Sequence, residues 1–411
     1  MITKKTFSNE LVKGGISLFI FLNIFNALNF FYQFLMARML GPSDYSTLAV
    51  LSTILYFIAI PSDSIQTIVT KYVSKFNASG ENSKTGYFLG KALRKGTMIS
   101  LLIFIVLMPI MILVFSYYLK ISFLLVLLTW ANVTIIFLIP VLRGAMQGLK
   151  KFNSLGFNLV AEGGLRLVIA VCLVTLGFGV YGAVIGAISS AFVAMLIAFI
   201  PLGYIFSLKK ERADISDIYK NSYPIIFTLV AIMLFQSIDV ILAKKFFSDV
   251  MAGQYAVANL VGKMVFFGTL AISRAMFPIS VERFEKNGNT SSIMKKSIIA
   301  AIILCALSIL FLWIFPEPFL RVFFGVDYLE ASNILVLSGI AFSFLSISNI
   351  ILLYGISINR ALKPAYVVFF LIFQICLLYL FRASLVLFAT GMVVSSLFLL
   401  IMSVIAVRKR S

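Results

Sequence analysis

The chain alternates long apolar stretches with short polar segments. A helix that spans a lipid bilayer needs about 20 predominantly apolar residues, and the apolar stretches approach or exceed that length. The pattern therefore predicts an all-α fold, a polytopic membrane protein with about twelve transmembrane helices. The predicted spans are residues 14–37, 46–70, 96–118, 121–142, 154–178, 180–206, 224–243, 252–279, 297–315, 333–356, 363–381 and 384–406.

Positive charge is distributed unevenly among the polar segments. Alternate segments, beginning with the N-terminal one, hold 25 Lys and Arg residues, whereas the others hold 6. Lys and Arg are enriched in cytoplasmic loops, so the distribution predicts that both termini are cytoplasmic. It also accounts for the net charge of +19 without nucleic acid as a partner.

Composition supports a membrane protein and limits the chemistry available to it. Hydrophobic residues make up 61% of the chain and charged residues 12%, with a mean hydropathy of +1.07. The absence of His excludes histidine metal sites and Ser-His or Cys-His catalysis. The segment that begins at Gly144 lacks the spacing of a nucleotide-binding P-loop. We therefore predict no catalytic residue, metal or cofactor, and a gradient as the driving force for any transport.

The chain divides near its middle. The longest polar segment, Ser207–Ser222, separates six predicted spans from six, so we predict an N-terminal lobe over 1–206, a cytoplasmic linker over 207–222 and a C-terminal lobe over 223–411. The region Phe34–Leu51 resembles Val240–Val261 once a short insertion is allowed. Because both halves begin on the same side, the repeats are expected to be parallel.

Six charged residues fall inside predicted spans, where each costs about 2.5–3.5 kcal/mol at the bilayer centre. Facing lipid, they would together cost on the order of 15–20 kcal/mol, so we predict that they face one another or a hydrated central cavity. The first span adds a stripe of polar amides. The residues predicted to line the cavity and bind substrate are Arg166, Lys263, Arg274, Asn23, Asn26 and Gln33, and the candidates for ion coupling are Asp63, Glu162 and Asp239.

Structural roles compete with these assignments. Glu162 and Arg166 are four residues apart on one helix and can neutralise each other. Arg274 lies near the inner interface and can snorkel to it, whereas Asp63 follows a proline and can satisfy loosened backbone. The amide stripe can mediate helix packing. Lys263 and Asp239 are deep and have no local partner in the sequence, which favours a functional role for both.

Three segments resemble the multidrug/oligosaccharidyl-lipid/polysaccharide exporter (MOP) superfamily, and within it the bacterial polysaccharide flippases. They are ARMLGPSDYSTLAVL at Ala37–Leu51, RGAMQGLKKFNSLGFNLVAEGGLRL at Arg143–Leu167 and SIDVILAKKF…AGQYAVANLVGK at Ser237–Lys263. The resemblance covers residues 11 to 405 and implies a MATE-like arrangement, in which two six-helix lobes surround a central cavity.

The resemblance implies a transporter rather than an enzyme. Its expected cargo is an undecaprenyl-pyrophosphate-linked oligosaccharide, moved across the bacterial cytoplasmic membrane for synthesis of O-antigen, capsule or exopolysaccharide. Lipid II flippases of this superfamily generally have fourteen spans, so twelve favours a polysaccharide repeat unit. The expected partners are this lipid-linked substrate, membrane lipids and the polysaccharide polymerase machinery. A cation-coupled multidrug exporter is the main alternative, followed by a membrane glycan polymerase or ligase.

Overall fold

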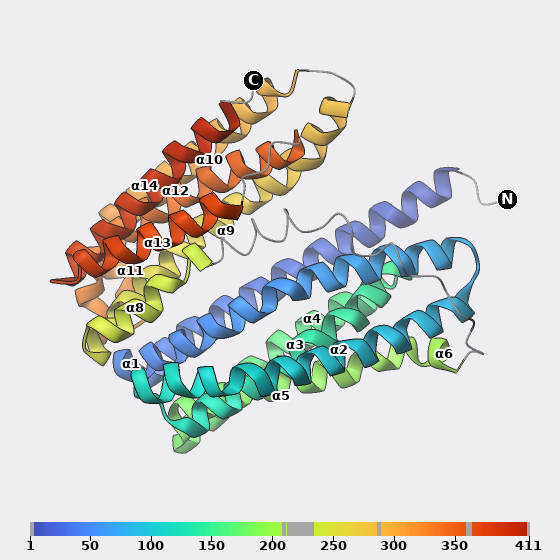
Figure 1. Cartoon of the computed structure of the whole chain (residues 1–411), viewed down its shortest axis with the longest axis horizontal. Helices are drawn as coiled ribbons and strands as arrows, with labels where there is room; N and C mark the ends of the chain where they lie inside the picture. Colours follow the sequence, from blue (N-terminus) through green and yellow to red (C-terminus); the bar gives the residue numbers. More distant parts are fainter. Residues whose placement is uncertain (1–3, 208–210, 212–233, 286–288, 359–363, 409–411) are drawn as a thin grey trace. The chain divides into compact units, whose positions relative to one another are not determined.

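A computed structural model of the chain describes residues 4–207, 211, 234–285, 289–358 and 364–408 (Figure 1). These residues form helices and short connections, without a β-strand. Helices suit a chain this apolar because they satisfy their backbone hydrogen bonds internally, where lipid offers no partner. The helices are α1 (Lys4–Ala78), α2 (Asn82–Met111), α3 (Phe123–Gly148), α4 (Phe152–Leu173), α5 (Gly179–Phe199), α6 (Gly203–Phe206), α8 (Ile238–Phe246), α9 (Asp249–Glu285), α10 (Ser291–Ile314), α11 (Pro316–Phe323), α12 (Ser332–Ser357), α13 (Pro364–Leu380) and α14 (Leu385–Arg408).

The predicted spans correspond to these helices. Within the described residues, eight helices are long and apolar enough to cross a membrane. One of them, Phe152–Phe206, contains two predicted spans, and Val368–Leu380 is a shorter apolar helix. The predicted span 46–70 is the second part of α1, whereas most of the span 224–243 lies outside the described residues. The chain is therefore an all-α, multi-pass membrane protein.

The chain forms two compact units, which we call unit 1 and unit 2. Unit 1 contains Met1–Leu40 and Ile54–Lys220, and unit 2 contains Gly41–Thr53 and Asn221–Ser411. The boundary near residue 220 falls within the predicted linker. The sequence did not predict that Gly41–Thr53 belongs to unit 2. It begins where α1 is interrupted at Gly41, whose φ of 70° and ψ of 172° are not helical.

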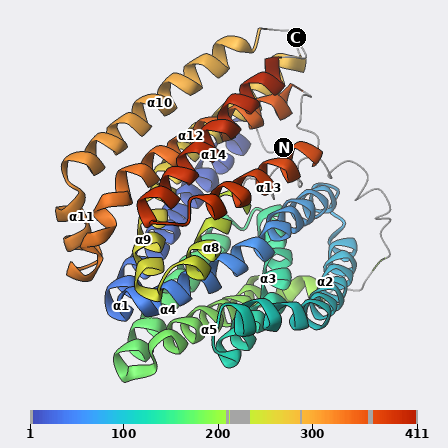
Figure 2. The same ribbon diagram turned by 60° about the vertical axis from the view of Figure 1, so that its left-hand side comes forward.

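Unit 1 contains a tight hairpin of α4 and α5, which pack along each other (Figure 1, Figure 2). The turn lies at Gly177 and Gly179, which both adopt positive φ. This is the position predicted between the spans 154–178 and 180–206. Gly186 allows the two helices to approach closely, since an added Cβ would lie 2.7 Å from the backbone nitrogen of Ala170. The hairpin fixes the position of the polar residues on α4.

A second close approach joins α3 to the latter part of α1. An added Cβ at Gly144 would lie 2.7 Å from the carbonyl oxygen of Gln66, and one at Gly148 would lie 2.7 Å from the Cβ of Val73. Thr70 Oγ1 donates to the Gly144 carbonyl oxygen at 3.2 Å. The G-x-x-x-G spacing thus serves helix packing, as small residues commonly do between membrane helices.

We expect Gly144→Leu to separate these helices and to cost about 1–3 kcal/mol through overpacking. Thermal unfolding of the purified protein in detergent measures this loss. The matched control is Gly164→Leu on α4, because an added Cβ there meets no atom within 4 Å. Equal unfolding midpoints for the two variants would contradict the assigned packing role of Gly144.

Unit 2 is organised around α12, which packs against α9, α10 and α14. Its segment Gly41–Thr53 is seated among these later elements. Tyr45 is 2% exposed and meets the ring of Tyr328 edge-on, with 6.3 Å between ring centroids. The Pro42 carbonyl oxygen approaches so closely that a Cβ added at Gly253 would lie 1.9 Å from it. Unit 2 is therefore built from two distant parts of the sequence.

Candidate functional site

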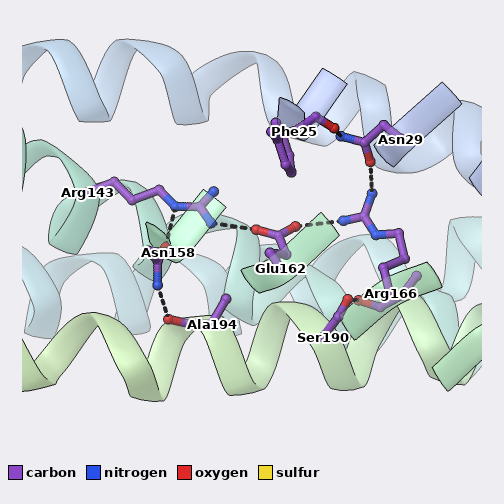
Figure 3. Close-up of polar contacts among 9 residues, drawn as sticks. Phe25, Asn29, Arg143, Asn158, Glu162, Arg166, Ser190 and Ala194 are labelled. Atoms are coloured by element: carbon purple, nitrogen blue, oxygen red, sulfur yellow. Dashed lines mark hydrogen bonds and ion pairs between the residues drawn. The ribbon is translucent and has the colours of Figure 1, made fainter. Parts of the chain in front are cut away.

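Unit 1 contains a buried cluster of two guanidinium groups and one carboxylate (Figure 3). Arg143, near the end of α3, donates from Nη2 to Glu162 Oε2 at 2.5 Å. Arg166, one turn beyond Glu162 on α4, donates from Nη2 to Glu162 Oε1 at 2.6 Å. Each carboxylate oxygen therefore accepts a charge-assisted hydrogen bond from a different arginine. We call these three residues the Arg–Glu–Arg cluster.

Neighbouring amides hold both arginines in place. Asn158 Oδ1 accepts from Arg143 Nε at 2.9 Å, and its Nδ2 donates to the Ala194 carbonyl oxygen on α5 at 2.6 Å. On the other side, Arg166 Nη1 donates to Asn29 Oδ1 on α1 at 2.8 Å. Residues 158, 162 and 166 lie on one face of α4 because they are four positions apart. Helices α1, α3, α4 and α5 thus all position the cluster.

The cluster carries a net positive charge. Two guanidinium groups are permanently charged, and a single carboxylate neutralises one of them. The Arg166 side chain is the most accessible member, at 22% exposure against 9% for Glu162. Its buried Nε has no hydrogen-bond partner among the described residues. Arg166 is therefore the most accessible positive charge of this cluster, and its binding of an anion stays a prediction.

The Glu162–Arg166 ion pair follows the predicted spacing, but the sequence did not reveal its third member. The predicted span 121–142 ends just before Arg143, so the charge pattern assigns Arg143 to the cytoplasmic segment that follows. The structure continues α3 to Gly148, and Arg143 is 9% exposed. The sequence did contain one signal for this cluster: Glu162 is a single carboxylate, and two arginines, Arg143 and Arg166, lie in the same predicted span or next to the neighbouring one.

Unit 2 holds a second buried polar group, around Asp239 on α8. Its Oδ2 accepts from Tyr255 Oη and from Asn259 Nδ2, both at 2.7 Å, while its buried Oδ1 has no hydrogen-bond partner among the described residues. Lys263 donates from Nζ to Ser237 Oγ at 3.2 Å and interacts electrostatically with Asp239. Residues 255, 259 and 263 lie on one face of α9.

The hydrogen-bond partners of Asp239 and Lys263 lie 16 to 26 positions away in the sequence, so the search for local partners did not reveal them. Spacing within one helix cannot reveal these partners, because Asp239 and Ser237 lie at the start of α8, whereas Tyr255, Asn259 and Lys263 lie on α9. The two charges still differ from the Arg–Glu–Arg cluster in one respect. Asp239 retains one oxygen without a donor among the described residues, which leaves it able to accept a proton or a further ligand.

Lys244 is another charged residue that sequence reasoning assigned to a loop. It is 8% exposed, and its Nζ contacts Ser46 Oγ at 2.7 Å, Thr47 Oγ1 at 3.1 Å and Asp249 Oδ1 at 2.8 Å. An ammonium group has three N–H donors, so all three are satisfied. Lys244 therefore has a structural role within unit 2, where it fixes the segment Gly41–Thr53.

The predicted amide stripe of α1 is divided between exposed and interior positions. Asn23 and Asn26 are exposed, whereas Gln33 is half-buried. The member that reaches a charged residue is Asn29, which was part of the stripe but was not among the predicted site residues. Asn29 also donates to the Phe25 carbonyl oxygen at 3.0 Å, as expected for a residue fixed within its own helix.

The side chains of Asp63 and Arg274 lie outside the described residues. Within the described part of the chain, no three His, Cys, Asp or Glu residues are arranged to hold a metal ion. The predicted residues are placed in two groups: Arg166 and Glu162 belong to unit 1, and Lys263 and Asp239 belong to unit 2. Their convergence on one central cavity stays a prediction.

Comparison with known proteins agrees with this architecture. Residues 11–284 match the family described as "Polysaccharide biosynthesis protein". An inward-facing multidrug resistance MATE family transporter of the MOP superfamily is 15% identical, with a TM-score of 0.75 over 96% of this chain and 98% of its own. A MOP superfamily transporter from Pyrococcus furiosus is also 15% identical, with a TM-score of 0.68 over 98% and 95%.

An outward-facing MATE family transporter is 14% identical, with a TM-score of 0.66 over 97% of this chain and 95% of its own. No curated protein matches the chain. At these identities the solved structures show the fold, and the family match adds the relationship by sequence. The chain belongs to the polysaccharide biosynthesis protein family and has the fold of the MOP superfamily transporters to which it is similar.

Proposed function

We propose that the protein flips an undecaprenyl-pyrophosphate-linked oligosaccharide from the inner to the outer leaflet of the bacterial cytoplasmic membrane, with both termini in the cytoplasm. The observation that carries the proposal is the buried Arg–Glu–Arg cluster, whose net charge is positive, in a member of a polysaccharide biosynthesis family. A buried positive charge is costly in a membrane protein unless it pairs with an anion. A pyrophosphate is such an anion.

In this proposal Arg166 and Lys263 attract the pyrophosphate into the predicted cavity, and Arg274, Asn23, Asn26 and Gln33 contact the pyrophosphate or the sugars. The polyprenyl tail stays in lipid. Rocking of the lobes then exposes the head group outside. An inside-negative potential of about 100 mV favours outward movement of a doubly charged pyrophosphate by roughly 4–5 kcal/mol if the protein charges stay fixed.

Ion coupling is assigned to Asp239 rather than to Glu162. Both oxygens of Glu162 accept hydrogen bonds from arginine, which favours a structural role. Asp239 has an Oδ1 without a donor among the described residues and lies within the electrostatic reach of Lys263. Asp63 is a further candidate from the sequence.

A cation-coupled multidrug exporter is the second candidate function, because two of the similar structures are multidrug resistance MATE family transporters. A cavity that takes cationic drugs is expected to be lined by carboxylates. In the Pyrococcus furiosus transporter, a binding pocket of reversed polarity suggests a different function. The net positive charge of the Arg–Glu–Arg cluster favours a similar distinction here, and hence an anionic cargo.

Reconstitution into proteoliposomes tests the proposal. We expect protein-dependent exposure of a pyrophosphate-linked polyprenyl oligosaccharide to an external glycan-modifying enzyme. Lys263→Ala should slow exposure about tenfold, because it removes a charge-assisted hydrogen bond, and Lys263→Arg should restore part of the rate. The matched control is Lys71→Ala, an exposed base on α1.

Two results would contradict the proposal, the first its mechanism and the second its function. One is normal exposure in the Lys263→Ala and Arg166→Ala variants at normal expression, which would remove the cationic residues from the mechanism. The other is an absence of exposure with an imposed potential and varied sugars, together with efflux of cationic dyes by the same vesicles. That second result would assign the protein to the drug exporters.

A further inference from the structure

The short turn between α13 and α14 presents an exposed arginine, Arg382. The turn is well defined by its hydrogen bonds. Phe381 N donates to the Leu377 carbonyl oxygen at 3.0 Å, and Leu387 N donates to Ser384 Oγ at 3.2 Å. Arg382 therefore projects from a fixed backbone. The charge distribution of the sequence predicts that this turn lies on the outer side of the membrane.

Aromatic rings support the guanidinium group of Arg382. Its Cζ lies 3.8 Å from the centroid of the Tyr379 ring and 5.9 Å from that of Phe246. These two rings meet edge-on, with 5.8 Å between centroids. Phe246 also packs on Phe388, which is fully buried. The stack is thus a surface layer on the aromatic core of unit 2.

The charge of Arg382 is not neutralised within the described part of the chain. The two ring contacts are its interactions there, and none of the ion pairs involves it. This differs from Lys244, whose charge is balanced by Asp249. Lys245, beside Phe246, is exposed and adds a second positive charge to this end of α8.

Positive charges on the outer side of a membrane protein call for a reason, because loops on that side are depleted of them. Arg382 is one of 6 such residues in the chain. Stacking on Tyr379 covers one face of the planar guanidinium and leaves its edge, with the N–H donors, directed away from the ring. A fixed guanidinium edge matches the oxygens of a phosphate group, since it can donate two parallel hydrogen bonds.

We propose that Arg382, stacked on Tyr379, forms a binding site for the phosphate group of a lipid. In this proposal the site lies at the surface of the cytoplasmic membrane that faces away from the cytoplasm. Half of the Tyr379 surface is exposed, so the site is open to the interface. Sugar stacking explains the arrangement less well, because Arg382 already covers a face of the Tyr379 ring. The phosphate belongs either to a membrane phospholipid or to a polyprenyl pyrophosphate after transport.

Native mass spectrometry of the full-length protein tests this site. The purified protein is incubated in separate arms with phosphatidylglycerol, undecaprenyl pyrophosphate or phosphatidylcholine, and retained lipid is measured as a function of concentration. We expect Arg382→Ala to weaken retention of a phosphate-bearing anionic lipid about tenfold. Tyr379→Leu should weaken it about threefold, because the charge remains but loses its stacking surface. Arg382→Lys should fall between wild type and Arg382→Ala.

Arg321→Ala on α11 is the matched control, since Arg321 is another exposed base predicted to lie outside. Stronger dependence on Arg382 for phosphatidylglycerol would identify a membrane-lipid site. Stronger dependence for undecaprenyl pyrophosphate would identify a site for the transported lipid. Unchanged retention in Arg382→Ala, or an equal loss in Arg321→Ala, would overturn the proposal.

Unfolding midpoints measured on the same samples show whether any loss of lipid comes from unfolding. The phosphatidylglycerol arm needs no transport, so this site does not rest on the proposed function. Failure of the flipping assay with a positive lipid-binding result would leave the Arg382 site in place. The reverse result would leave the flippase function in place without it.

Discussion

Replacing Glu162 with glutamine is expected to destabilise unit 1 by about 3–5 kcal/mol, because it leaves two buried guanidinium groups without a counter-charge. In the native cluster, Arg143 and Arg166 each donate to one of its oxygens. An amide has one oxygen and one N–H₂ group, so one of these contacts becomes a contact between two donors. Loss of charge and loss of a hydrogen bond act in the same direction.

The two tryptophans allow the effect to be measured in one unit. Trp130 is 1% exposed in unit 1, and its Nε1 donates to the Phe104 carbonyl oxygen, whereas Trp313 is 68% exposed in unit 2. In a Trp313→Phe background, the fluorescence of Trp130 reports the unfolding of unit 1. The Glu162→Gln variant is expected to unfold at a clearly lower temperature or denaturant concentration.

The matched control is the double variant Arg143→Met, Glu162→Gln. It removes one positive and one negative charge, so the net charge of the cluster is unchanged and Arg166 keeps its bond to Asn29. Replacement of a buried ion pair by groups of similar volume is often neutral. The double variant should therefore be more stable than Glu162→Gln alone. An equal or lower stability would contradict the assignment of Glu162 as the counter-charge of Arg143.

The second large effect is expected from Gly253→Leu in unit 2. Its Cβ would lie 1.9 Å from the Pro42 carbonyl oxygen, a separation that forces the backbone of one segment to move. Overpacking in a tight core costs about 1–3 kcal/mol and more when backbone must shift, so we expect a loss of at least about 3 kcal/mol. The segment Gly41–Thr53 should then no longer pack against α9.

Thiol labelling measures this displacement directly. Cys172, Cys305 and Cys376 are the free cysteines and are first replaced by serine. In that background Ser46→Cys reports the segment, because Ser46 is 1% exposed. We expect its thiol to react at least about tenfold faster when Gly253→Leu is added, as for a site opened by more than one kcal/mol. Adding Gly164→Leu instead should not change the rate, and a similar rate in both variants would contradict the role of Gly253.

The sequence predicted the membrane helices well because apolar length is a local property. The turn at Gly177 and Gly179 lies between two predicted spans. The fate of buried charge was harder to predict. Arg143 and Lys244 follow apolar runs, where a basic residue normally marks the end of a span, yet both are buried. Their partners lie on other helices, and hydropathy does not detect such partners.

The hydrogen-bond partners of the predicted site residues show the same contrast between local patterns and contacts between helices. The spacing of Glu162 and Arg166 revealed an ion pair within one helix, which the structure confirms. The bonds of Asp239 to Tyr255 and Asn259 join α8 to α9, so their formation depends on how these helices pack. Sequence patterns therefore identified the residues buried in the membrane more reliably than the contacts that satisfy them.

Because Gly41–Thr53 packs within unit 2, the two parts of unit 2 are synthesised at different times during translation. Lys244 follows its partner Ser46 by 198 residues. At synthesis rates of about 5–20 residues per second, the first hairpin waits roughly 10–40 seconds before the ammonium group that holds it has been made. During that interval Ser46 can donate to the Ser43 carbonyl oxygen within the segment, but neither Ser46 nor Thr47 can accept from Lys244. Unit 2 is thus begun early in translation and completed only after the whole of unit 1 has been synthesised.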